Sequence, residues 1–461
     1  MHHIESVAAI FERALDRILA RVFVSATNPL PPLAVAYSGG LDSSVLLHLA
    51  HEFAARRGIR LLAFHIHHGL SPHADAWLAH CDSECVRMGV GFDARRVLVA
   101  VDDGRGLEAA ARTARYAALG ELCRAHRVPL LLTAHHQDDQ AETVLLQMLR
   151  GAGMAGMSGM AEAGDAPDLL GDEQTLLARP LLDVPRTMLR DWVVVCGIAH
   201  VEDESNLDTR HPRNALRNAI WPLLQAHFPA FRECIVRSAQ HAQAGQRMLD
   251  ELAAQDLVAC MDAGGLDVRR MRGLSRERAD NLLRHWLMVN GVRMPSSAWL
   301  REARLQLFDA RDDAQVCVRL EGWQLRRYRS RIMLTTIDDG APEAASASFH
   351  WAGEASIRFV AFGGTLHFDA VDGGLDSDWL RGQSLRIEYH RGGGKLKPAL
   401  NRPGAGLKKL YQERSIPAWE RKRLPLVWAG EALLFAAGIG QDCRFPVAAA
   451  GISLRWERHT S

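Results

Sequence analysis

The sequence of 461 residues has only eight cysteines, and no two of them form a CxxC pair. Disulfide scaffolds, iron–sulfur sites and thioredoxin-like redox pairs depend on cysteines that are grouped in the sequence. The scattered cysteines argue against all three and are typical of reduced thiols in the cytosol.

The sequence also lacks any apolar run that approaches the roughly 20 residues of a membrane span. Near the N-terminus, Val7, Ile10, Phe11, Leu15 and Ile18 recur at helical spacing with acidic residues between them, whereas a signal peptide has a basic start and an unbroken apolar core. We therefore expect a cytoplasmic protein without membrane association. The 55 basic and 54 acidic residues leave a formal charge of +1, so no whole-protein field favours nucleic acid or an acidic partner.

Three short apolar runs, each followed directly by polar or glycine-rich residues, stand out in the first third of the chain. They are LAVAY, LLAFHI and VPLLLTA, and they are followed by SGGLDS, HHGLS and HHQDD. Near-continuous apolar strands separated by helical patterns are typical of a parallel sheet that is covered on both faces. We predict a doubly wound α/β domain, in which ligands bind beyond the carboxyl ends of the strands. The three polar segments therefore mark one site.

The rest of the chain divides by composition. After the α/β domain, which we assign to residues 1–222, amphipathic stretches such as the one around Trp286 predict a mostly helical middle domain over residues 223–337. The segment DDGAPEAASAS is small and polar and predicts a linker over residues 338–349. Alternating pieces such as SIRFV and LRIEYH predict a small β-rich C-terminal domain over residues 350–461.

The glycine-containing stretch SGGLDS lies between a predicted strand and a predicted helix, where backbone N–H groups and the helix dipole favour an anion. Gly39 and Gly40 would let the main chain approach an oxygen-rich ligand, Ser38 and Ser43 would donate hydrogen bonds, and Asp42 could hold magnesium. The lysine of the Walker pattern is absent, so the loop suits pyrophosphate better than transfer of a γ-phosphoryl group. The alternative is a tight turn in which the serine and aspartate side chains only cap the helix.

Two histidine- and carboxylate-rich clusters end the second and third predicted strands. On the helix that begins near Gln137, Asp138 and Glu142 are four residues apart and share a face, with Asp139 beside them. Such a group can bind metal ions, although the aspartates could instead cap the helix and the histidines be satisfied locally. A metal-dependent phosphohydrolase is a further alternative, but it leaves the SGGLDS loop without a role. The clustered residues are His65, His67, His68, His135, His136, Asp138, Asp139 and Glu142.

Two helical segments carry arginines that share a face. In GLEAAARTARY these are Arg112 and Arg115 together with Glu108, an arrangement that is commonly a surface salt bridge. In RHPRNALRN, Arg213 and Arg217 could grip phosphates in a bidentate way. A surface helix with paired charges would look much the same, so both interpretations stay open.

The segment from Arg386 to Arg423 is locally basic, with eleven basic and three acidic residues. Tyr389, Tyr411 and Trp419 lie among these basic side chains. Basic and aromatic residues together are typical of a surface that follows nucleic-acid phosphates, and a solvated surface on a small domain is the alternative. The RNA-binding candidates in this segment are Lys395, Lys397, Lys408, Lys409, Arg414 and Arg421.

These segments resemble known families. SGGLDS after an apolar strand is similar to the signature loop of the ATP pyrophosphatases, whose fold is adenine nucleotide alpha hydrolase-like and which transfer AMP to a carbonyl or carboxylate oxygen. With HIHHGLS, LEAAARTARY, TAHHQDDQAETVLL, ARPLL and DESNLDTRHPRNALR following in order, the sequence resembles the tRNA(Ile)-lysidine synthases. RADNLLRHWL and KKLYQERSIPAWERKRLPLVWAG extend the resemblance toward the C-terminus. His67 and Ser71 stand where the family usually has asparagine and arginine, which puts any contact of that arginine in doubt.

The resemblance implies a two-step reaction on the wobble cytidine of the isoleucine tRNA with a CAU anticodon. ATP would adenylate the C2 carbonyl oxygen with release of pyrophosphate, and the ε-amine of free L-lysine would then attack C2 and expel AMP. The resulting lysidine would change codon reading and amino-acid identity from methionine to isoleucine. The implied cofactors are ATP and Mg²⁺, the implied partners are tRNA(Ile) and free L-lysine, and a homodimer is left open.

The resemblance also implies residue roles. Asp42, His135, Asp138 and Asp139 would be catalytic, and Asp42 and Asp139 would also hold magnesium. A carboxylate would deprotonate the amine, and the sequence does not rank Asp138, Asp139 and Glu142 for this role. Another adenylating enzyme with a small-molecule acceptor, or a plain RNA-binding protein, remains an alternative. The residues that would bind ATP are Ser38, Gly39, Gly40, Leu41, Asp42, Ser43, His65, His68, Gly69, Arg112 and Arg115.

Overall fold

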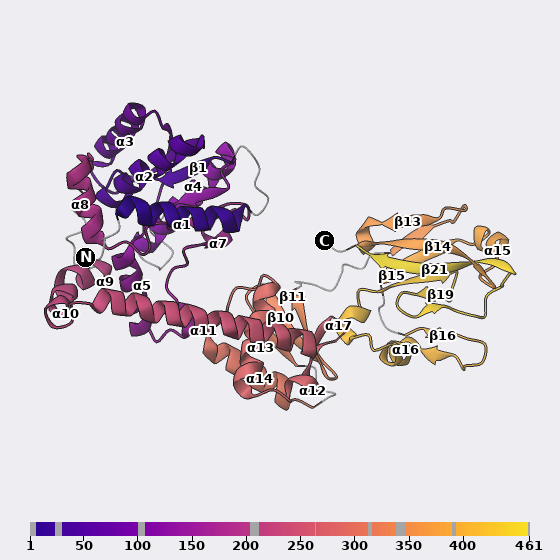
Figure 1. The fold of residues 1–461 in the computed structure, drawn as a ribbon. Coiled ribbons are helices and arrows are strands. Elements are labelled where there is room, and N and C mark those ends of the chain that lie inside the picture. Colours follow the sequence, from indigo (N-terminus) through magenta and orange to yellow (C-terminus); the bar gives the residue numbers. More distant parts are fainter. Residues whose placement is uncertain are drawn as a thin grey trace. The chain divides into compact units, whose positions relative to one another are not determined.

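The chain forms two compact units, Met1–Glu251 and Leu252–Ser461. Helix α11 (Phe231–Cys260) is one long helix that contains the division between them (Figure 1). The domain boundaries expected from composition remain predictions. The computed structural model describes residues 6–23, 30–99, 107–202, 212–262, 264–311, 316–337, 346–389 and 393–459.

A six-stranded sheet with the strand order β3-β2-β1-β4-β6-β5 forms the centre of the N-terminal unit. Neighbouring strands pair in parallel except at one edge, where β5 runs antiparallel to β6. The three apolar runs of the sequence form β1, β2 and β4, and the predicted mostly parallel sheet is confirmed. The strands are β1 (Leu33–Ala36), β2 (Leu61–His67), β3 (Gly91–Arg96), β4 (Leu130–Leu132), β5 (Ala163–Asp165) and β6 (Leu176–Ala178).

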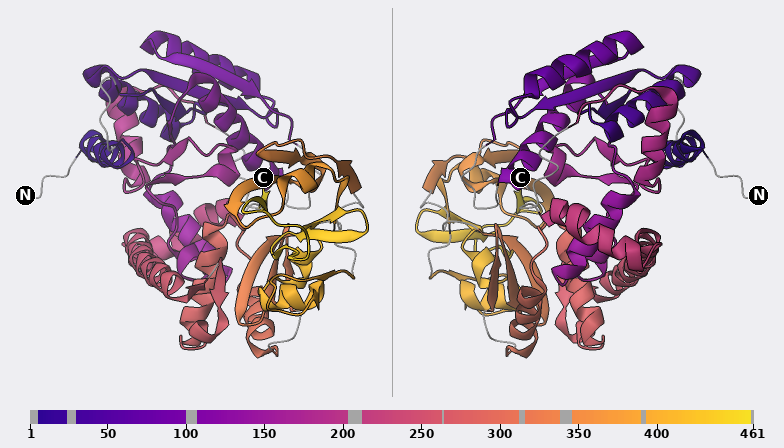
Figure 2. Two further views of the ribbon diagram at one scale, coloured as in Figure 1. Left: turned by 90° about the vertical axis from the view of Figure 1, so that its right-hand side faces the viewer. Right: turned by 90° about the vertical axis from the view of Figure 1, so that its left-hand side faces the viewer.

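Successive residues of a strand point to opposite faces of the sheet, and in β1 and β4 both sets of side chains are apolar. Helices therefore cover both faces. Leu33 and Val35 belong to a core with α1, α2, α3 and α8, whereas Ala34 and Phe64 belong to a second core with α4 and α7. The doubly wound fold is therefore confirmed, and Figure 2 shows the ribbon from two opposite sides. The helices are α1 (Val7–Val22), α2 (Leu41–Arg57), α3 (Ala74–Met88), α4 (Leu107–His126), α5 (Gln137–Leu149), α6 (Met154–Met157), α7 (Pro167–Leu170), α8 (Arg186–Cys196), α9 (Pro212–Ala215), a π-helical turn (Leu216–Ile220) and α10 (Trp221–His227).

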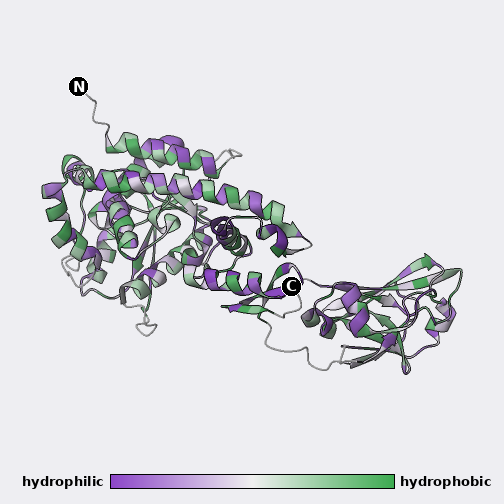
Figure 3. Ribbon diagram, turned by 90° about the horizontal axis from the view of Figure 1, so that it is seen from below, coloured by the Kyte–Doolittle hydropathy of each residue, from purple (hydrophilic) through white to green (hydrophobic). Residues whose placement is uncertain are grey.

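Helix α1 shows how the sequence pattern directs packing. Ser6 caps the helix by accepting a hydrogen bond from the backbone N–H of Ala9 at 3.2 Å. Phe11, Leu15 and Ile18 are then buried on one face, as their spacing predicts. Figure 3 shows hydrophobic and hydrophilic residues alternating along the helices. None of the described helices is long and apolar enough to cross a lipid bilayer.

The first part of the C-terminal unit confirms the predicted helical middle region and adds a sheet that the sequence pattern did not reveal. Helix α13 buries Leu282, Leu283 and Trp286 in a core with α14 and the sheet. The sheet has the order β7-β8-β11-β10-β9 and is antiparallel throughout. The elements are α12 (Val268–Met271), α13 (Arg276–Val289), α14 (Ser297–Asp309), β7 (Met261–Asp262), β8 (Gly265–Asp267), β9 (Cys317–Leu320), β10 (Trp323–Tyr328) and β11 (Arg331–Thr336).

The remainder of this unit is rich in β-structure, as predicted. A five-stranded sheet of order β12-β15-β18-β19-β20 and a three-stranded sheet of order β13-β14-β21 share a core that includes Trp351 and Val427. Strand β12 occupies the last four residues of the predicted linker, and residues 338–345 lie outside the described part of the chain. The elements are β12 (Ser346–Phe349), β13 (Ser356–Phe359), β14 (Gly364–Asp372), β15 (Leu385–Tyr389), β16 (Lys395–Leu396), β17 (Ala405–Gly406), β18 (Pro425–Ala429), β19 (Ala432–Ala436), β20 (Gly440–Gln441), β21 (Ala450–Arg458), α15 (Ser377–Arg381), α16 (Leu407–Glu413) and α17 (Ala418–Arg421).

Candidate functional site

A cavity of about 1470 Å³ lies at the carboxyl ends of β1, β2 and β4 in the N-terminal unit. Residues of α3, α4, α5, α8, the π-helical turn, α10 and the first turn of α11 contribute to its wall. The predicted residues Gly39, Gly69, Arg112 and Asp139 are not part of the lining. The cavity thus brings together most of the residues that the sequence marked as one site, namely Ser38, Gly40, Leu41, Asp42, Ser43, His65, His68, Arg115, His135 and Asp138.

The SGGLDS segment forms a loop before α2 in which the hydroxyl of Ser43 donates to the carbonyl oxygen of Gly40 at 3.0 Å. Gly39 has a φ of +81°, and a Cβ atom there would lie 2.9 Å from the Sγ atom of Cys81. The hydroxyl oxygens of Ser38 and Ser43 are 3.0 Å apart. The N-cap residue of α2 is Gly40, and no side chain caps the helix. The capping by serine and aspartate side chains that the alternative required is therefore wrong, although the serine hydroxyls do bond within the turn. The positive end of the helix dipole meets the cavity.

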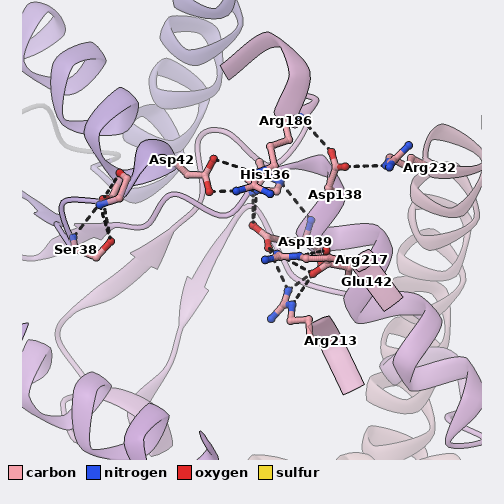
Figure 4. A network of polar contacts seen from close by, with 12 residues as sticks. Ser38, Asp42, His136, Asp138, Asp139, Glu142, Arg186, Arg213, Arg217 and Arg232 are labelled. Carbon is pink, nitrogen blue, oxygen red and sulfur yellow. Dashed lines mark hydrogen bonds and ion pairs between the residues drawn. The ribbon is translucent and has the colours of Figure 1, made fainter. Parts of the chain in front are cut away.

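His136 joins the loop to the carboxylates at the start of α5 (Figure 4). Its Nε2 atom lies 3.6 Å from Oδ2 of Asp42 and 3.3 Å from Oδ2 of Asp139. Burial alone would lower the pKa of His136, but the hydrogen bond to Asp42 and the charges of both carboxylates raise it above its ordinary value. Burial alone would raise the pKa of Asp42 and of Asp139, but the neighbouring cations hold both below their ordinary values.

Glu142 is fully buried beside this network and is held by two arginines. Its carboxylate lies 2.6 Å from Nε of Arg213 and 2.5 Å from Nε of Arg217, and Arg217 also reaches Oδ1 of Asp139 at 2.8 Å. A buried carboxylate needs such counter-charges because its transfer out of water is costly. Both arginines were predicted to bind RNA phosphates. In this structure their guanidinium groups are engaged by carboxylates, and the RNA role remains a prediction.

Asp138 has two partners that sequence reasoning missed. Arg232 from α11 places its Nε atom 2.7 Å from Oδ2 of Asp138, and the backbone N–H of Arg186 donates to Oδ1 at 3.1 Å (Figure 4). The side chain of Arg186 also approaches the loop, with Nε 3.7 Å from Oδ1 of Asp42. Arg232 lies in no motif that the sequence analysis used. Arg186 follows the ARPLL motif closely, and this position in the sequence could have marked it as a site residue.

The histidines of β2 turn to separate protein groups. Nδ1 of His65 lies 3.0 Å from the carbonyl oxygen of Tyr37, and Nε2 of His67 lies 3.2 Å from the carboxylate of Asp75. His68 lines the cavity. Throughout the residues that the structure describes, no group of three or more histidine, cysteine, aspartate or glutamate side chains is placed to hold a metal ion. The shared metal ligation that the phosphohydrolase alternative requires does not appear in these contacts.

His135 lines the cavity with a ring that is neutral at physiological pH. Burial is the largest cause that lowers its pKa, to about 3. Its Nδ1 atom lies 2.9 Å from Oγ1 of Thr133, whose hydroxyl donates to the carbonyl oxygen of Ala178 at 3.2 Å. Because the hydroxyl proton of Thr133 is used in the bond to Ala178, the bond to His135 must take its proton from Nδ1 of the ring. Nε2 of the neutral ring is then an acceptor.

Arg112 and Arg115 of α4 stack over an aromatic ring. Their guanidinium carbons lie 4.9 and 5.3 Å from the ring centre of Tyr116, which is buried. Burial lowers the pKa of Arg115, which lines the cavity. The side chain of Glu108 lies outside the described residues, so the predicted salt bridge to it stays a prediction.

The basic C-terminal segment is only partly exposed. Tyr411 is fully buried in a core, so the expectation that its ring lies on an RNA-facing surface is wrong. Its ring packs between strand and helix residues. A count of charged residues along the segment contains no information about such burial. Arg421 is half-buried and donates from Nε to the carbonyl oxygen of Ile416 at 2.9 Å. Lys397 is half-buried, and the exposed candidates are Lys395, Lys408, Lys409 and Arg414.

Comparison with known proteins adds the family. Residues 8–224 match the PP-loop domain, residues 266–333 the TilS substrate binding domain and residues 385–456 the TilS substrate C-terminal domain. A tRNA(Ile)-lysidine synthase from Ralstonia nicotianae is 42% identical over 462 residues, which cover 97% of each chain. The chain belongs to the tRNA(Ile)-lysidine synthase family.

Other members of the tRNA(Ile)-lysidine synthase family are similar over nearly the same length. The protein from Burkholderia pseudomallei is 40% identical over 93% of this chain and 94% of its own, and that from Alkalilimnicola ehrlichii is 39% identical over 94% and 95%. The resemblance inferred from the sequence motifs is therefore confirmed. In this lysidine synthase family member the match to the PP-loop domain ends at residue 224, and every residue that lines the cavity lies within or shortly after it.

Proposed function

We propose that the protein is an ATP-dependent ligase that attaches free L-lysine to C2 of the wobble cytidine in tRNA(Ile) with a CAU anticodon. One observation carries the proposal: a relative named tRNA(Ile)-lysidine synthase matches 97% of the chain at 42% identity. The cavity supports it, because a pyrophosphate-binding type of loop and a cluster of carboxylates meet in one space.

The first step would adenylate the C2 oxygen. The N-terminus of α2, the backbone around Gly39 and Gly40, and the hydroxyls of Ser38 and Ser43 would hold the phosphates of ATP. A ring carbonyl oxygen is a poor leaving group, and its phosphate ester is a better one. Adenylation with release of pyrophosphate therefore prepares C2 for attack by an amine, and the amine then displaces AMP.

Magnesium fits this loop through Asp42. Its Oδ1 atom is buried without a hydrogen-bond partner among the described residues, and Mg²⁺ prefers carboxylate oxygens. Asp139, the second predicted ligand, has its carboxylate engaged by His136, Arg213 and Arg217. Asp42 is therefore the better-supported ligand. Magnesium bound there would neutralise negative charge on the phosphates.

The second step requires a base, because the attacking ammonium group must first lose a proton. Asp138 and Glu142 line the cavity, whereas Asp139 does not. The side chain of Asp138 is 15% exposed and that of Glu142 is 1% exposed, with both Glu142 oxygens bound by arginines. Both oxygens of Asp138 are also engaged, by Arg232 and by the backbone N–H of Arg186, so its greater exposure alone ranks Asp138 first as the base.

The products of ATP cleavage test this proposal against its alternatives. In the presence of free L-lysine, ATP should give AMP and pyrophosphate only when an unmodified tRNA(Ile) transcript is added. AMP formation without RNA would favour an adenylating enzyme with a small-molecule acceptor, and ADP with phosphate would favour a phosphohydrolase. Asp42→Asn should abolish the cleavage, whereas Asp16→Asn, which alters a surface pair with Arg57, should not.

A further inference from the structure

We propose that the cavity-facing side of α8 binds the RNA backbone next to the target cytidine, with Arg190 as the phosphate contact. The inference rests on the proposed function, because it takes the RNA as the substrate that enters this cavity. It goes beyond that function in naming a contact surface on the N-terminal unit.

Helix α8 has two distinct sides. Leu189 and Val193 are buried and belong to the core beneath the helix. Arg186, Arg190 and Val194 follow one another at four-residue spacing, which places them on a neighbouring side, and all three line the cavity. A continuous stripe of this helix therefore faces the space in which the reaction would occur.

Among the arginines of the cavity wall, Arg190 has neither a carboxylate nor an aromatic partner in the described part of the chain. Arg115 lies over the ring of Tyr116 at 5.3 Å, and Nε of Arg186 lies 3.7 Å from Asp42. Arg217 is bound to Glu142 and Arg232 to Asp138. Arg190 is exposed and forms no hydrogen bond or ion pair in the part of the chain that the structure describes. Its guanidinium group keeps all of its donors available, and that group matches phosphate oxygens in a bidentate way.

The surroundings of Arg190 favour RNA over ATP as the source of the phosphate. Val194 and Val195, which follow it on the helix, are each 81% exposed. Unpaired bases of an RNA loop offer faces that can cover such apolar side chains. The adenine of ATP offers a similar face, but the proposed function assigns the phosphates of ATP to the SGGLDS loop and the N-terminus of α2, which leaves Arg190 on α8 to the RNA backbone. The chain has a formal charge of only +1, so attraction to the RNA backbone depends on local cations such as Arg190 and the basic segment from Arg386 to Arg423.

The test measures binding of an unmodified tRNA(Ile) transcript to the full chain without ATP, over a series of KCl concentrations. Arg190→Gln should weaken binding about five- to twentyfold and lower the slope of log affinity against log salt by about one, because one phosphate contact is lost. The KM for ATP should not change. The matched control is Arg60→Gln, an exposed arginine directly before β2 and thus at the opposite edge of the sheet, which should leave affinity and slope unchanged.

A second variant, Val194→Asp, places a negative charge on the same stripe at an exposed position and should also weaken RNA binding. If Arg190→Gln raises the KM for ATP and leaves the RNA slope intact, Arg190 contacts ATP and the inference is wrong. Unchanged RNA affinity in both variants would overturn it as well. The protein could also bind RNA through Arg190 but never transfer lysine. In that case this inference would hold and the proposed reaction would be wrong.

Discussion

Replacement of Glu142 by glutamine probes the buried cluster that supports the cavity. The substitution keeps the shape of the side chain and removes its charge, so two guanidinium groups within about 2.6 Å face a neutral amide. Breaking a buried ion pair by neutralising one partner costs about 3–5 kcal/mol. The arginine side chains are 28% and 23% exposed, so water compensates part of this loss and we expect about 2–3 kcal/mol.

The assay is urea unfolding of the full chain, followed through the transition of the N-terminal unit. With a denaturant slope of roughly 3 kcal/mol per molar urea, Glu142→Gln should lower the midpoint by about 0.7–1 M. The matched control is Glu12→Gln, which neutralises an exposed pair with Arg56 at 3.2 Å and should cost less than about 1 kcal/mol. If the midpoint of Glu142→Gln equals that of the control, the buried cluster contributes no more to stability than a surface ion pair, contrary to this prediction.

Three further predictions concern the loop and the two histidines. Gly39→Ala should raise the KM for ATP and destabilise by about 1–2 kcal/mol, because φ is +81° and the new Cβ meets Cys81; an unchanged KM would contradict the proposed role of the loop. His136→Asn removes the bridge between Asp42 and Asp139 and should slow AMP formation more than it changes the KM for tRNA. Burial lowers the pKa of His135 from 6.5 to about 3, so the unfolded chain binds more protons between these values and this residue destabilises the fold as pH falls below 6.5. The free energy of unfolding of His135→Asn should therefore fall less than that of the wild type between pH 6.5 and 4. An equal fall would show that the folded protein does not bury His135 as a neutral ring.

The sequence predicted the strands that position the cavity and missed others for a physical reason. Strands β1, β2 and β4 are buried on both faces and therefore read as apolar runs. Strand β3, GFDARR, lies at the edge of the sheet and is largely polar, and β5 and β6 have three residues each. The sheet of the middle region includes WQLRRY, where charged residues interrupt the pattern. Edge and short strands carry little of the burial signal on which sequence patterns depend.

The site was predictable in its location and less so in its pairings. The loop, the histidines and the α5 carboxylates end neighbouring strands, so topology alone brings them together. The contacts of Arg213 and Arg217 with Glu142 join residues 71 and 75 positions apart, and that of Arg186 with Asp138 spans 48 positions. Helical spacing shows which arginines share a face and contains no information about the distant partner that they meet.

The most direct test of the central claim is incorporation of radiolabelled lysine into an unmodified tRNA(Ile) transcript with ATP and magnesium, beside a reaction without ATP. We expect label to enter the RNA only with ATP, one AMP to be released for each lysine attached, and no label to enter a transcript in which uridine replaces the wobble cytidine. Incorporation that does not need ATP, or ATP cleavage to AMP with RNA but without lysine transfer, would contradict the claim.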